Sequence, residues 1–437
     1  DADTLRRRFP SALIVPTVGT DDSLGYCLHT WLQNAPDEII FVVAGKQEEQ
    51  EFATKKVNDA ISACLKAIGP ECPTRCKVVW SPVINKRHQL VQGVRAADPS
   101  IDVFIFLDDD VDWPETFLLW ALKPFEERNC GVSAQPRVAQ RALHAPNCLR
   151  VASPPPTFVP LTGPRHSSLP HRRSQAVTTT QRMRACGARP TTWEILADIR
   201  LVWRFVDVAA TQVLDRGCQC ASGRTAAFRA CIVRDEQFLS GLPSEYWGEK
   251  LLVSGDDKFC TRWLTQHDWL IYAQLWRPEC TIGTTFKTDA SFLKQLLRWT
   301  RNTWRSDVRA VFLEAFMWRR HPFLSLIMVE KMTSPFTTLA GIALVTHGVL
   351  FSWIASVDAA VACYILVSRG LRLLPYVLLR RTPHRLMYLP QFVLFMFFVQ
   401  LIKLYALFTL HITTWYTRAA STSTKGAGTA AAGPSPA

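Results

Sequence analysis

Short apolar runs alternate with longer polar stretches over the first 130 residues. The apolar runs lie at residues 12–16, 38–43, 76–80 and 103–107. Polar stretches of helical length separate them, at residues 22–34, 47–68 and 86–97. Continuous apolar runs of this length are typical of strands that are buried on both faces. Their alternation with helices predicts an α/β fold with a doubly wound, mostly parallel sheet.

The pattern becomes helical after residue 190. A helix is predicted from Thr192 to residue 213, and the segment 251–320 is predicted to be helical, with Arg and Trp at intervals. The run Phe336–Ala355 has twenty residues without a charged side chain, which matches the length needed to span a hydrocarbon core. Further apolar runs follow at 359–367, 371–379 and 388–402. We therefore expect interfacial and transmembrane helices over 321–416; a helix buried in a soluble protein is the alternative for Phe336–Ala355.

Positive charge is concentrated in two places. Residues 131–193 contain nine Arg and nine Pro but no Asp, Glu or Lys, so they carry nine of the thirteen net positive charges. Five arginines between the last apolar runs place that stretch in the cytosol by the positive-inside rule: Arg369, Arg372, Arg380, Arg381 and Arg385. No stripe of basic and aromatic residues recurs elsewhere, so we do not expect nucleic acid as a partner.

Thirteen Cys without a C-x-x-C pair predict scattered reduced thiols.

Residues 134–179 interrupt the α/β pattern. They are rich in Pro, Arg, Ser and His and show neither the helical nor the strand period, so we expect a disordered insert. A bolder hypothesis is that they are a translated intron, because joining Ser133 directly to Thr180 would restore a compact α/β connection. Finding these codons in the mature message would contradict it. The Ala- and Ser-rich tail 417–437 is also expected to be disordered.

An acidic cluster follows the fourth predicted strand, as Asp108-Asp109-Asp110. Ligands of a doubly wound sheet bind at the carboxyl ends of its strands. Asp108 and Asp110 stand two positions apart and can present oxygen atoms on one side, and Mg²⁺ and Mn²⁺ prefer carboxylate and phosphate oxygens. We predict that the pair holds such an ion against a diphosphate. A solvated loop at a strand end is the alternative.

A second acidic cluster is Ser254-Gly255-Asp256-Asp257-Lys258. A carboxylate at the start of a helix can act as the general base toward a hydroxyl group. Asp257 is our first choice for this base and Asp256 the second. The alternative is structural: Ser254 or Asp256 would cap a helix over 258–266, where the helix dipole favours an acidic side chain.

A third motif, Gln295-x-x-Arg298-Trp299, would lie on one face of a helix. Arginine can bind phosphate with two parallel hydrogen bonds, and tryptophan presents a flat apolar surface to a sugar ring. The alternative is an amphipathic helix on a membrane surface, with basic and aromatic residues.

Two further segments carry candidate binding residues. Asn85-Lys86-Arg87 follows the third strand and could contact a nucleotide through Lys86 and Arg87, or simply be a solvated helix start. The segment Ser222–Arg229 has small residues that let an acceptor approach the backbone, with Ser222, Gly223 and Arg224 as candidate binding residues, or it could form a helix N-terminus.

Together, these motifs resemble the processive family 2 glycosyltransferases, which are the hyaluronan, chitin and cellulose synthases, and most of all the fungal type 2 polysaccharide synthases. The resemblance covers residues 11–133 and 180–417 and rests on Phe106–Pro114, Ser222–Arg229, Ser254–Lys258 and Gln295–Trp299. The ending from Leu404 to Trp415 also resembles the C-terminus of hyaluronan synthases.

The resemblance implies a cytosolic GT-A-like catalytic domain joined to membrane helices that form a channel for the product. Its implied roles are diphosphate and metal binding by Asp108 and Asp110, general base catalysis by Asp257, diphosphate and acceptor binding by Gln295, Arg298 and Trp299, and nucleotide contact by Lys86. The corresponding division of the chain is 1–133, 134–179, 180–320, 321–416 and 417–437. Many relatives have an Asp that contacts uracil where this chain has Val43-Ala44-Gly45.

We therefore expect a metal-dependent, inverting enzyme that polymerises a sugar from a UDP-sugar donor into a β-linked polysaccharide and extrudes it. It would be a multi-pass protein of the plasma membrane, with the lipid bilayer and the growing polysaccharide as partners. We also expect that a piece carrying the N-terminal membrane helices of these relatives precedes Asp1. The alternatives are a non-processive transferase acting on a lipid phosphate, an inactive membrane scaffold and a pure transporter.

Overall fold

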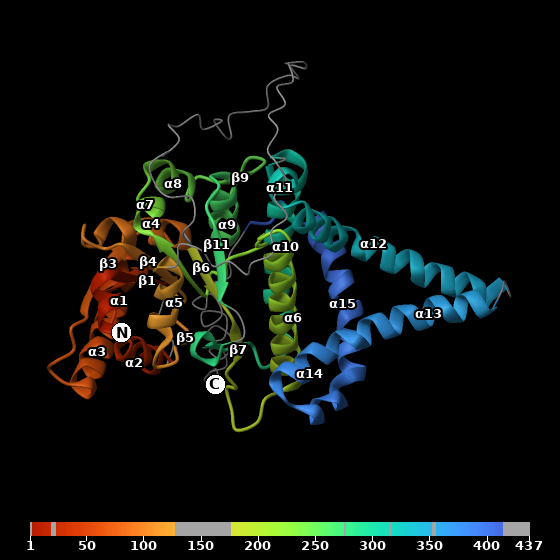
Figure 1. The fold of residues 1–437 in the computed structure, drawn as a ribbon, viewed down its shortest axis with the longest axis horizontal. Coiled ribbons are helices and arrows are strands. Elements are labelled where there is room, and N and C mark those ends of the chain that lie inside the picture. Colours follow the sequence, from red (N-terminus) through yellow and green to blue (C-terminus); the bar gives the residue numbers. More distant parts are fainter. Residues whose placement is uncertain are drawn as a thin grey trace, which may run out of the picture.

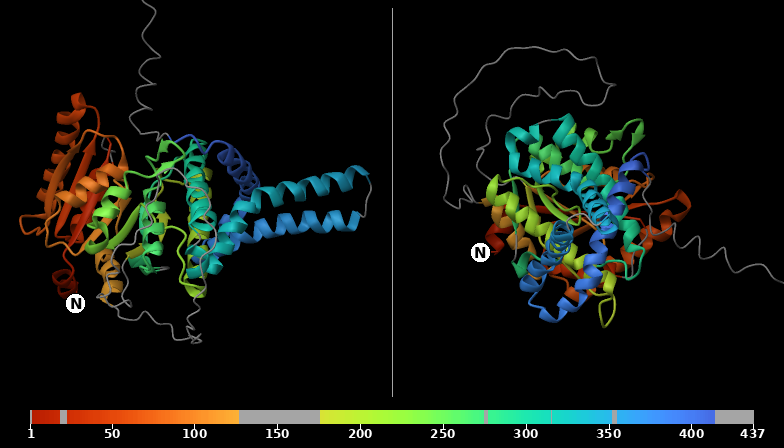
Figure 2. Two further views of the ribbon diagram at one scale, coloured as in Figure 1. Left: turned by 90° about the horizontal axis from the view of Figure 1, so that it is seen from above. Right: turned by 90° about the vertical axis from the view of Figure 1, so that its right-hand side faces the viewer.

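The computed structural model describes residues 2–18, 23–126, 176–274, 277–314, 316–351 and 355–413. A central sheet with helices on both faces is followed by a group of C-terminal helices (Figure 1). Two of these helices, α12 (Pro322–Phe351) and α13 (Ala355–Gly370), extend side by side away from the body (Figure 2).

Seven strands form the central sheet, in the order β11-β6-β8-β4-β1-β2-β3. Their bounds are β1 Ser11–Thr17, β2 Glu38–Ala44, β3 Arg75–Ser81, β4 Val103–Leu107, β6 Ala176–Thr179, β8 Thr225–Arg229 and β11 Ile271–Gln274. Strand β8 runs antiparallel to both of its neighbours, and every other pair in this sheet is parallel. The four strands predicted from the apolar runs are confirmed, and the mixed sheet is consistent with the GT-A-like fold.

The strands feed two apolar layers, because consecutive side chains of a strand point to opposite faces. On β1, Leu13 and Val15 join one layer, while Ala12 and Ile14 join the other. The first layer is covered by α1 (Ala2–Arg8), α2 (Leu24–Gln33), α3 (Gln50–Ile68) and α5 (Phe117–Glu126). The second is covered by α4 (Lys86–Ala96), α7 (Ala230–Val233), α8 (Glu236–Gly241) and α9 (Asp256–Gln266). The sheet is therefore doubly wound, as predicted.

The prediction that the segment 251–320 is helical is wrong in part, because the segment also contains strands. Strand β11 pairs with β6, and β12 (Ile282–Thr284) pairs with β5 (Val111–Asp112) and β7 (Gln181–Met183) in a small second sheet. A short hairpin, β9 (Tyr246–Trp247) with β10 (Lys250–Leu251), also precedes α9. Pairing with strands far away in the sequence overrides the local helix propensity of these residues.

Residues 134–175 of the predicted insert lie outside the residues that the structure describes. Its last four residues contradict the prediction, because Ala176–Thr179 form the buried strand β6 between β8 and β11. Joining Ser133 to Thr180 would therefore delete the strand that connects β11 to the rest of the sheet. The excised segment of the intron hypothesis would have to end before Ala176.

The remaining helices lie beside the sheet, and all of them except α13 contribute to two further apolar clusters. They are α6 (Thr192–Leu214), α10 (Phe292–Val308), α11 (Phe316–Arg320), α12, α13, α14 (Leu374–Arg380) and α15 (Leu389–Phe408). Short 3-10 turns lie at Gln47–Glu49, Pro278–Cys280, Leu371–Leu373 and Pro383–Tyr388, and a π-helical turn, Arg309–Leu313, continues α10. Helix α6, which the sequence predicted, begins with a capping box between Thr191 and Glu194.

Two described segments are long and apolar enough to cross a membrane, Ala359–Arg380 and Pro383–Phe408. Core helices of soluble proteins can share this length and composition. The apolar run 336–355 forms the outer part of α12 as far as Phe351 and continues into α13, apart from 352–354, which lie outside the description. The alternative of a buried helix is contradicted there, because Phe336 and Leu344 are about half exposed.

Candidate functional site

The candidate residues converge at one edge of the central sheet. Strand β4 ends at Leu107, so Asp108–Asp110 emerge at that edge, and β3 leads through a short loop into α4 and Lys86. Strand β8 runs the opposite way, so it begins where β4 ends: Leu107 pairs with Thr225, and Asp108 N donates to Arg224 O at 3.1 Å. The antiparallel direction of β8 therefore brings Ser222-Gly223-Arg224 beside the acidic cluster. These residues precede a strand, so the alternative of a helix N-terminus is wrong.

Lys86 connects the two acidic clusters. Its Nζ lies 2.8 Å from Asp108 Oδ1 and 3.0 Å from Asp256 Oδ2, and it also donates to Gly223 O at 3.3 Å. Burial alone would lower the pKa of the Lys86 ammonium, but the two carboxylates outweigh burial and raise it. Gly223 permits this close approach, because a Cβ there would lie only 3.2 Å from Asp256 Oδ2. Lys86 is thus a fixed, largely buried cation, with its side chain 12% exposed, rather than a solvated helix start.

The two candidates for the general base have different surroundings. Asp256 is the first residue of α9 and is buried; desolvation raises its pKa, but Lys86 outweighs desolvation and the pKa falls below its ordinary value. The residue before it, Gly255, takes the left-handed conformation with φ 79°, and no side chain caps α9. The predicted capping by Ser254 or Asp256 is therefore wrong, and Asp256 is an ion-pair partner rather than an accessible base.

Asp257 lies half-buried in the wall of the cleft and is better placed to act as a base. Its Oδ1 accepts from Lys258 N at 2.9 Å, and its Oδ2 accepts from Cys220 Sγ at 3.1 Å. Burial, followed by the charge of Asp257, raises the pKa of the Cys220 thiol, so this thiol stays protonated and donates to the carboxylate. The sequence motifs gave no sign of Cys220, because its contact depends on the loop before β8.

Helix α10 places its three predicted residues on the same cleft: Gln295, Arg298 and Trp299. Gln295 Oε1 is buried and has no hydrogen-bond partner among the described residues, so it is available to a ligand. The Trp299 ring lies 5.1 Å from the Arg224 guanidinium, which also lies 4.9 Å from the Phe286 ring. These cation–π contacts hold Arg224 between two aromatic rings and fix its direction.

Ser222 and Arg224 share a partner, Gln181 of β7. Gln181 Nε2 donates to Ser222 Oγ, and Arg224 Nη1 donates to Gln181 Oε1 at 3.1 Å. Both Ser222 and Arg224 line the cleft. Arg224 therefore lies near the acidic cluster, and Asp110 and Asp108 act electrostatically on it. It is a candidate for contact with a diphosphate bound there.

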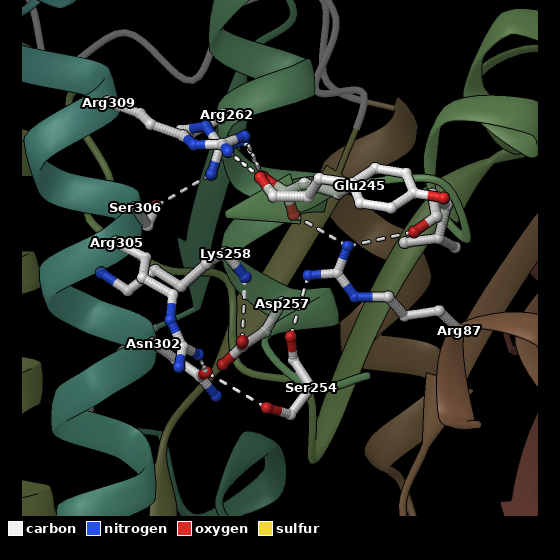
Figure 3. Close-up of polar contacts among 12 residues, drawn as sticks. Arg87, Glu245, Ser254, Asp257, Lys258, Arg262, Asn302, Arg305, Ser306 and Arg309 are labelled. Atoms are coloured by element: carbon white, nitrogen blue, oxygen red, sulfur yellow. Dashed lines mark hydrogen bonds and ion pairs between the residues drawn. The ribbon is translucent and has the colours of Figure 1, made fainter. Parts of the chain in front are cut away.

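Arg87 does not line this cleft, unlike the other predicted site residues. It is fully buried and points away, into a cluster centred on Glu245 (Figure 3). Its Nη1 lies 2.8 Å from Glu245 Oε2, and its Nη2 donates to Ser254 O at 2.9 Å. The helix turns successive side chains through about 100°, and on α4 this rotation directs Arg87 away from the cleft that Lys86 lines. The prediction that Arg87 binds substrate is not supported by its position.

Both predicted metal ligands, Asp108 and Asp110, line the cleft. Within the described residues there is no group of three or more His, Cys, Asp or Glu side chains that could hold an ion. Two carboxylates can hold Mg²⁺ or Mn²⁺ only if other oxygen atoms complete the coordination shell of the ion. The oxygens of a diphosphate are suitable ligands for this purpose. The residues therefore fit an ion that is shared with a bound diphosphate.

The cleft that contains these residues has a volume of about 2000 Å³ and continues from the sheet edge between α6, α10, α12, α13 and α15. Several of its residues were not singled out from the sequence. Arg184 lies 2.8 Å from Asp112 and 5.0 Å from the Tyr26 ring, in a place set by the small second sheet. On α6, Arg200 and Arg204 stand four positions apart, a helical spacing that could have identified them.

If the cleft binds a diphosphate such as that of UDP, Lys86→Met should weaken this binding by about 10- to 100-fold, because the change removes charge-assisted hydrogen bonds and leaves Asp108 and Asp256 to repel the diphosphate. Titration calorimetry of the full chain would measure the effect. Lys123→Met, an exposed substitution on α5, is the matched control. Equal UDP affinity in the two variants would show that Lys86 has only a structural role.

Comparison with known proteins gives consistent matches. The sequence model of the family described as "Glycosyltransferase like family 2" matches residues 10–302. A type 2 glycosyltransferase of Pyricularia oryzae is 28% identical over 419 residues, covering 93% of this chain and 73% of that protein. A protein of the same name from Gibberella zeae is 27% identical, covering 93% and 68%. The NDP-glycosyltransferase ltbB of Aspergillus luteorubrus is 28% identical over 338 residues, covering 75% and 69%.

Proposed function

The chain belongs to the glycosyltransferase-like family 2, and from this premise we propose that it is a membrane-embedded synthase that polymerises a sugar from a UDP-sugar donor. Family membership makes it a transferase with a nucleotide-sugar donor and an acceptor. The observation that carries the finer proposal is that one cleft is lined by Lys86 and Asp108 at the sheet edge, by Asp257 and by the α10 motif. Donor and acceptor can therefore meet at Asp257.

In the proposed reaction, Asp257 takes the proton of an acceptor hydroxyl group as its oxygen attacks the anomeric carbon of the donor sugar. Attack from the face opposite the leaving diphosphate inverts the configuration and forms a β-linkage. Positive charge develops at the anomeric carbon and negative charge on the diphosphate. Lys86, Arg224 and Arg298 are cations on this cleft that can stabilise the negative charge. When bound at Asp108 and Asp110, Mg²⁺ or Mn²⁺ would neutralise the diphosphate further.

Repeated transfer at the membrane is supported by the arrangement of the helices. The α10 motif and the walls from α12, α13 and α15 line one continuous space, so a product that leaves Asp257 has a path between helices. Two of the lining segments are apolar and long enough to span a bilayer. We propose a multi-pass protein of the plasma membrane with a cytosolic catalytic part, in which this space conducts the growing chain outward.

The test is incubation of membranes carrying the protein with radiolabelled UDP-GlcNAc, UDP-glucose and UDP-glucuronate, singly and mixed. UDP release together with product of high molecular mass would support a polymerising synthase and identify its sugar. Short products from every donor would contradict polymerisation and favour a single transfer. Release of UDP from none of them would favour the inactive scaffold.

Metal dependence has its own expected outcome. Removing divalent ions with EDTA should lower turnover by at least about 100-fold, because a bound cation supplies several kcal/mol of charge stabilisation to a leaving diphosphate. Adding back Mn²⁺ or Mg²⁺ should restore turnover, and Asp110→Asn should raise the metal concentration that is needed. Full turnover in EDTA would show that Lys86 and the arginines suffice.

A further inference from the structure

The proposed base, Asp257, is held by two neutral hydrogen-bond donors. Its Oδ1 accepts from the backbone N–H of Lys258 at 2.9 Å (Figure 3). Its Oδ2 accepts from the Cys220 thiol at 3.1 Å. An ionised carboxylate can accept about four hydrogen bonds. The two donors therefore leave room for an acceptor hydroxyl group in the cleft that Asp257 lines.

The cations near this carboxylate do not orient it through an ion pair. Lys258 of α9 and Arg298 of α10 both interact electrostatically with Asp257. The Lys258 ammonium is directed to another carboxylate, however, and lies 3.0 Å from Asp307 Oδ1. An ion pair would make a carboxylate a weaker base, because it stabilises the ionised form. The site thus orients the base with neutral groups.

The backbone around Cys220 is fixed by the surrounding helices. The Cys220 carbonyl accepts from Arg204 Nη2 of α6 at 3.1 Å. The backbone N–H of Ala221 donates to Thr261 Oγ1 at 2.8 Å, and this hydroxyl group donates to the carbonyl of Asp257 at 2.7 Å. The loop before β8 and the first turns of α9 are therefore joined through Thr261 as well as through the thiol.

Gln219, which precedes Cys220, anchors the same loop to three helices. Its Nε2 donates to Asp307 Oδ2 of α10 at 2.8 Å, and its Oε1 accepts from Lys331 Nζ of α12 at 2.7 Å. Its carbonyl accepts from Lys258 Nζ of α9 at 3.3 Å. These contacts determine where the loop lies, and they hold Cys220 against the base.

The thiol proton of Cys220 has two acceptors within reach. Asp257 Oδ2 lies 3.1 Å from the sulfur and Ala221 O lies 3.7 Å from it, so distance and charge both favour the carboxylate. Burial, followed by the charge of Asp257, raises the pKa of the thiol, which keeps the proton on sulfur. A thiol is a weak donor. It can therefore direct the carboxylate while leaving most of its basicity.

We propose that Cys220 is a positioning residue for sugar transfer, because its thiol holds the Asp257 carboxylate in the orientation that meets the acceptor hydroxyl group. The inference rests on the proposed function, in which Asp257 is the general base. The thiol acts through Asp257, and no bond to its sulfur forms or breaks. Without the thiol, the carboxylate can rotate away from the acceptor, and a displacement of about 1 Å can lower a rate by up to about 10²-fold.

The first experiment compares two Cys220 variants of the full chain by UDP release over a range of donor concentrations. Cys220→Ala should lower kcat by about tenfold and change KM for the donor by less than about twofold, because the cations proposed to bind the diphosphate are unchanged. Cys220→Ser restores a donor, so its kcat should stay within about threefold of the parent value. Cys231→Ala, on α7 and outside the cleft, is the matched control and should leave both constants unchanged.

The second experiment detects the contact between thiol and carboxylate without turnover. N-ethylmaleimide reacts with the thiolate, and its reaction at Cys220 can be followed by mass spectrometry of the peptide. Asp257→Asn removes the charge that raises the pKa of the thiol but keeps Arg204 and Lys258, which lower it. The labelling rate at Cys220 should therefore rise by about tenfold. The control Asp268→Asn changes an exposed carboxylate and should leave that rate unchanged.

The outcomes distinguish this inference from the proposed function. Parent kcat in Cys220→Ala would overturn the inference, and so would equal losses in the Ala and Ser variants, which would indicate packing alone. Equal labelling rates in Asp257→Asn and Asp268→Asn would overturn it as well. Melting temperatures show whether each variant folds, and if Cys220→Ala does not, the labelling experiment decides, since it keeps Cys220 intact. Absence of UDP release by the parent chain with every donor would overturn the proposed function instead, and the labelling rates would still show whether thiol and carboxylate are paired.

Discussion

Asp257→Asn should lower turnover by about 10²–10⁴-fold while leaving UDP binding nearly unchanged. The amide has the shape of the carboxylate but cannot accept the proton of the acceptor hydroxyl group, and general base catalysis contributes a factor of this size. UDP binding is expected to persist, because Asp257 makes no hydrogen bond or ion pair with Lys86, whose carboxylate partners are Asp108 and Asp256. UDP release in the presence of acceptor, together with a UDP titration, measures both quantities.

The matched control is Asp268→Asn, since Asp268 follows the other end of α9 and its side chain is 74% exposed. That variant should turn over like the parent chain. Asp256→Asn is an informative companion, because it should weaken UDP binding by loosening Lys86. If Asp257→Asn abolished UDP binding and Asp256→Asn abolished turnover alone, the two roles would have to be exchanged.

Glu245→Gln should destabilise the folded chain by about 3–5 kcal/mol, the cost of removing one partner from a buried ion pair. Glu245 accepts from arginines on three elements: Arg87 of α4 at 2.8 Å, Arg262 of α9 at 2.5 Å and Arg309 after α10 at 3.1 Å (Figure 3). Its side chain is only 2% exposed, so water cannot take its place. Thermal unfolding followed by tryptophan fluorescence would measure the loss.

Acid titration separates this charge effect from a packing effect. Burial raises the pKa of Glu245, but Arg262, Arg87 and Arg309 outweigh burial and lower it to about 2, below the ordinary value of 4.5. A lowered pKa stabilises the folded state above pH 4.5, and that contribution disappears as the pH falls from 4.5 toward 2. The parent chain should therefore lose more stability than the Gln variant in this range. If the free energies of unfolding of the parent chain and the Gln variant changed with pH in parallel, the effect of Glu245→Gln would come from packing alone.

Glu236→Gln is the control for this pair of measurements. Glu236 pairs with Arg95 at 3.4 Å, with both side chains more than half exposed. Exposed pairs of this kind contribute little, so the free energy of unfolding should stay within about 0.5 kcal/mol of the parent. A loss as large as that of Glu245→Gln would show that any glutamate substitution destabilises this chain.

The sequence predicted which residues lie at the sheet edge better than it predicted the side-chain contacts that they make there. The apolar runs located β1 to β4, and the acidic clusters and the α10 motif all reached one cleft. Arg87 was misplaced because its neighbour Lys86 faces the cleft and the helix turns Arg87 away from it. Cys220 could not be found, since its contact with Asp257 joins the loop before β8 to the first turn of α9, and the approach of the two is set by the direction of β8.

Strand β6 was missed for a related reason. Its residues, Ala176–Thr179, are four small or β-branched residues next to a Pro- and Arg-rich stretch, so composition alone assigned them to that stretch. Their pairing with β8 on one side and β11 on the other defines them as a strand. Information from distant partners was also needed for β11 and β12, which the sequence placed in a helical region.

The two ends of the cleft rest largely on different apolar clusters. The donor end is built on the sheet and its two layers, whereas α10, α12 and α15 around the acceptor end pack in two further clusters, and α6 joins both parts because its Val208 packs in the second layer of the sheet. Substitutions that reshape the helical end therefore need not disturb the sheet that holds the diphosphate. A chain divided in this way can change what it glycosylates over evolutionary time while keeping the same nucleotide chemistry, and an engineer could exchange one half at a time.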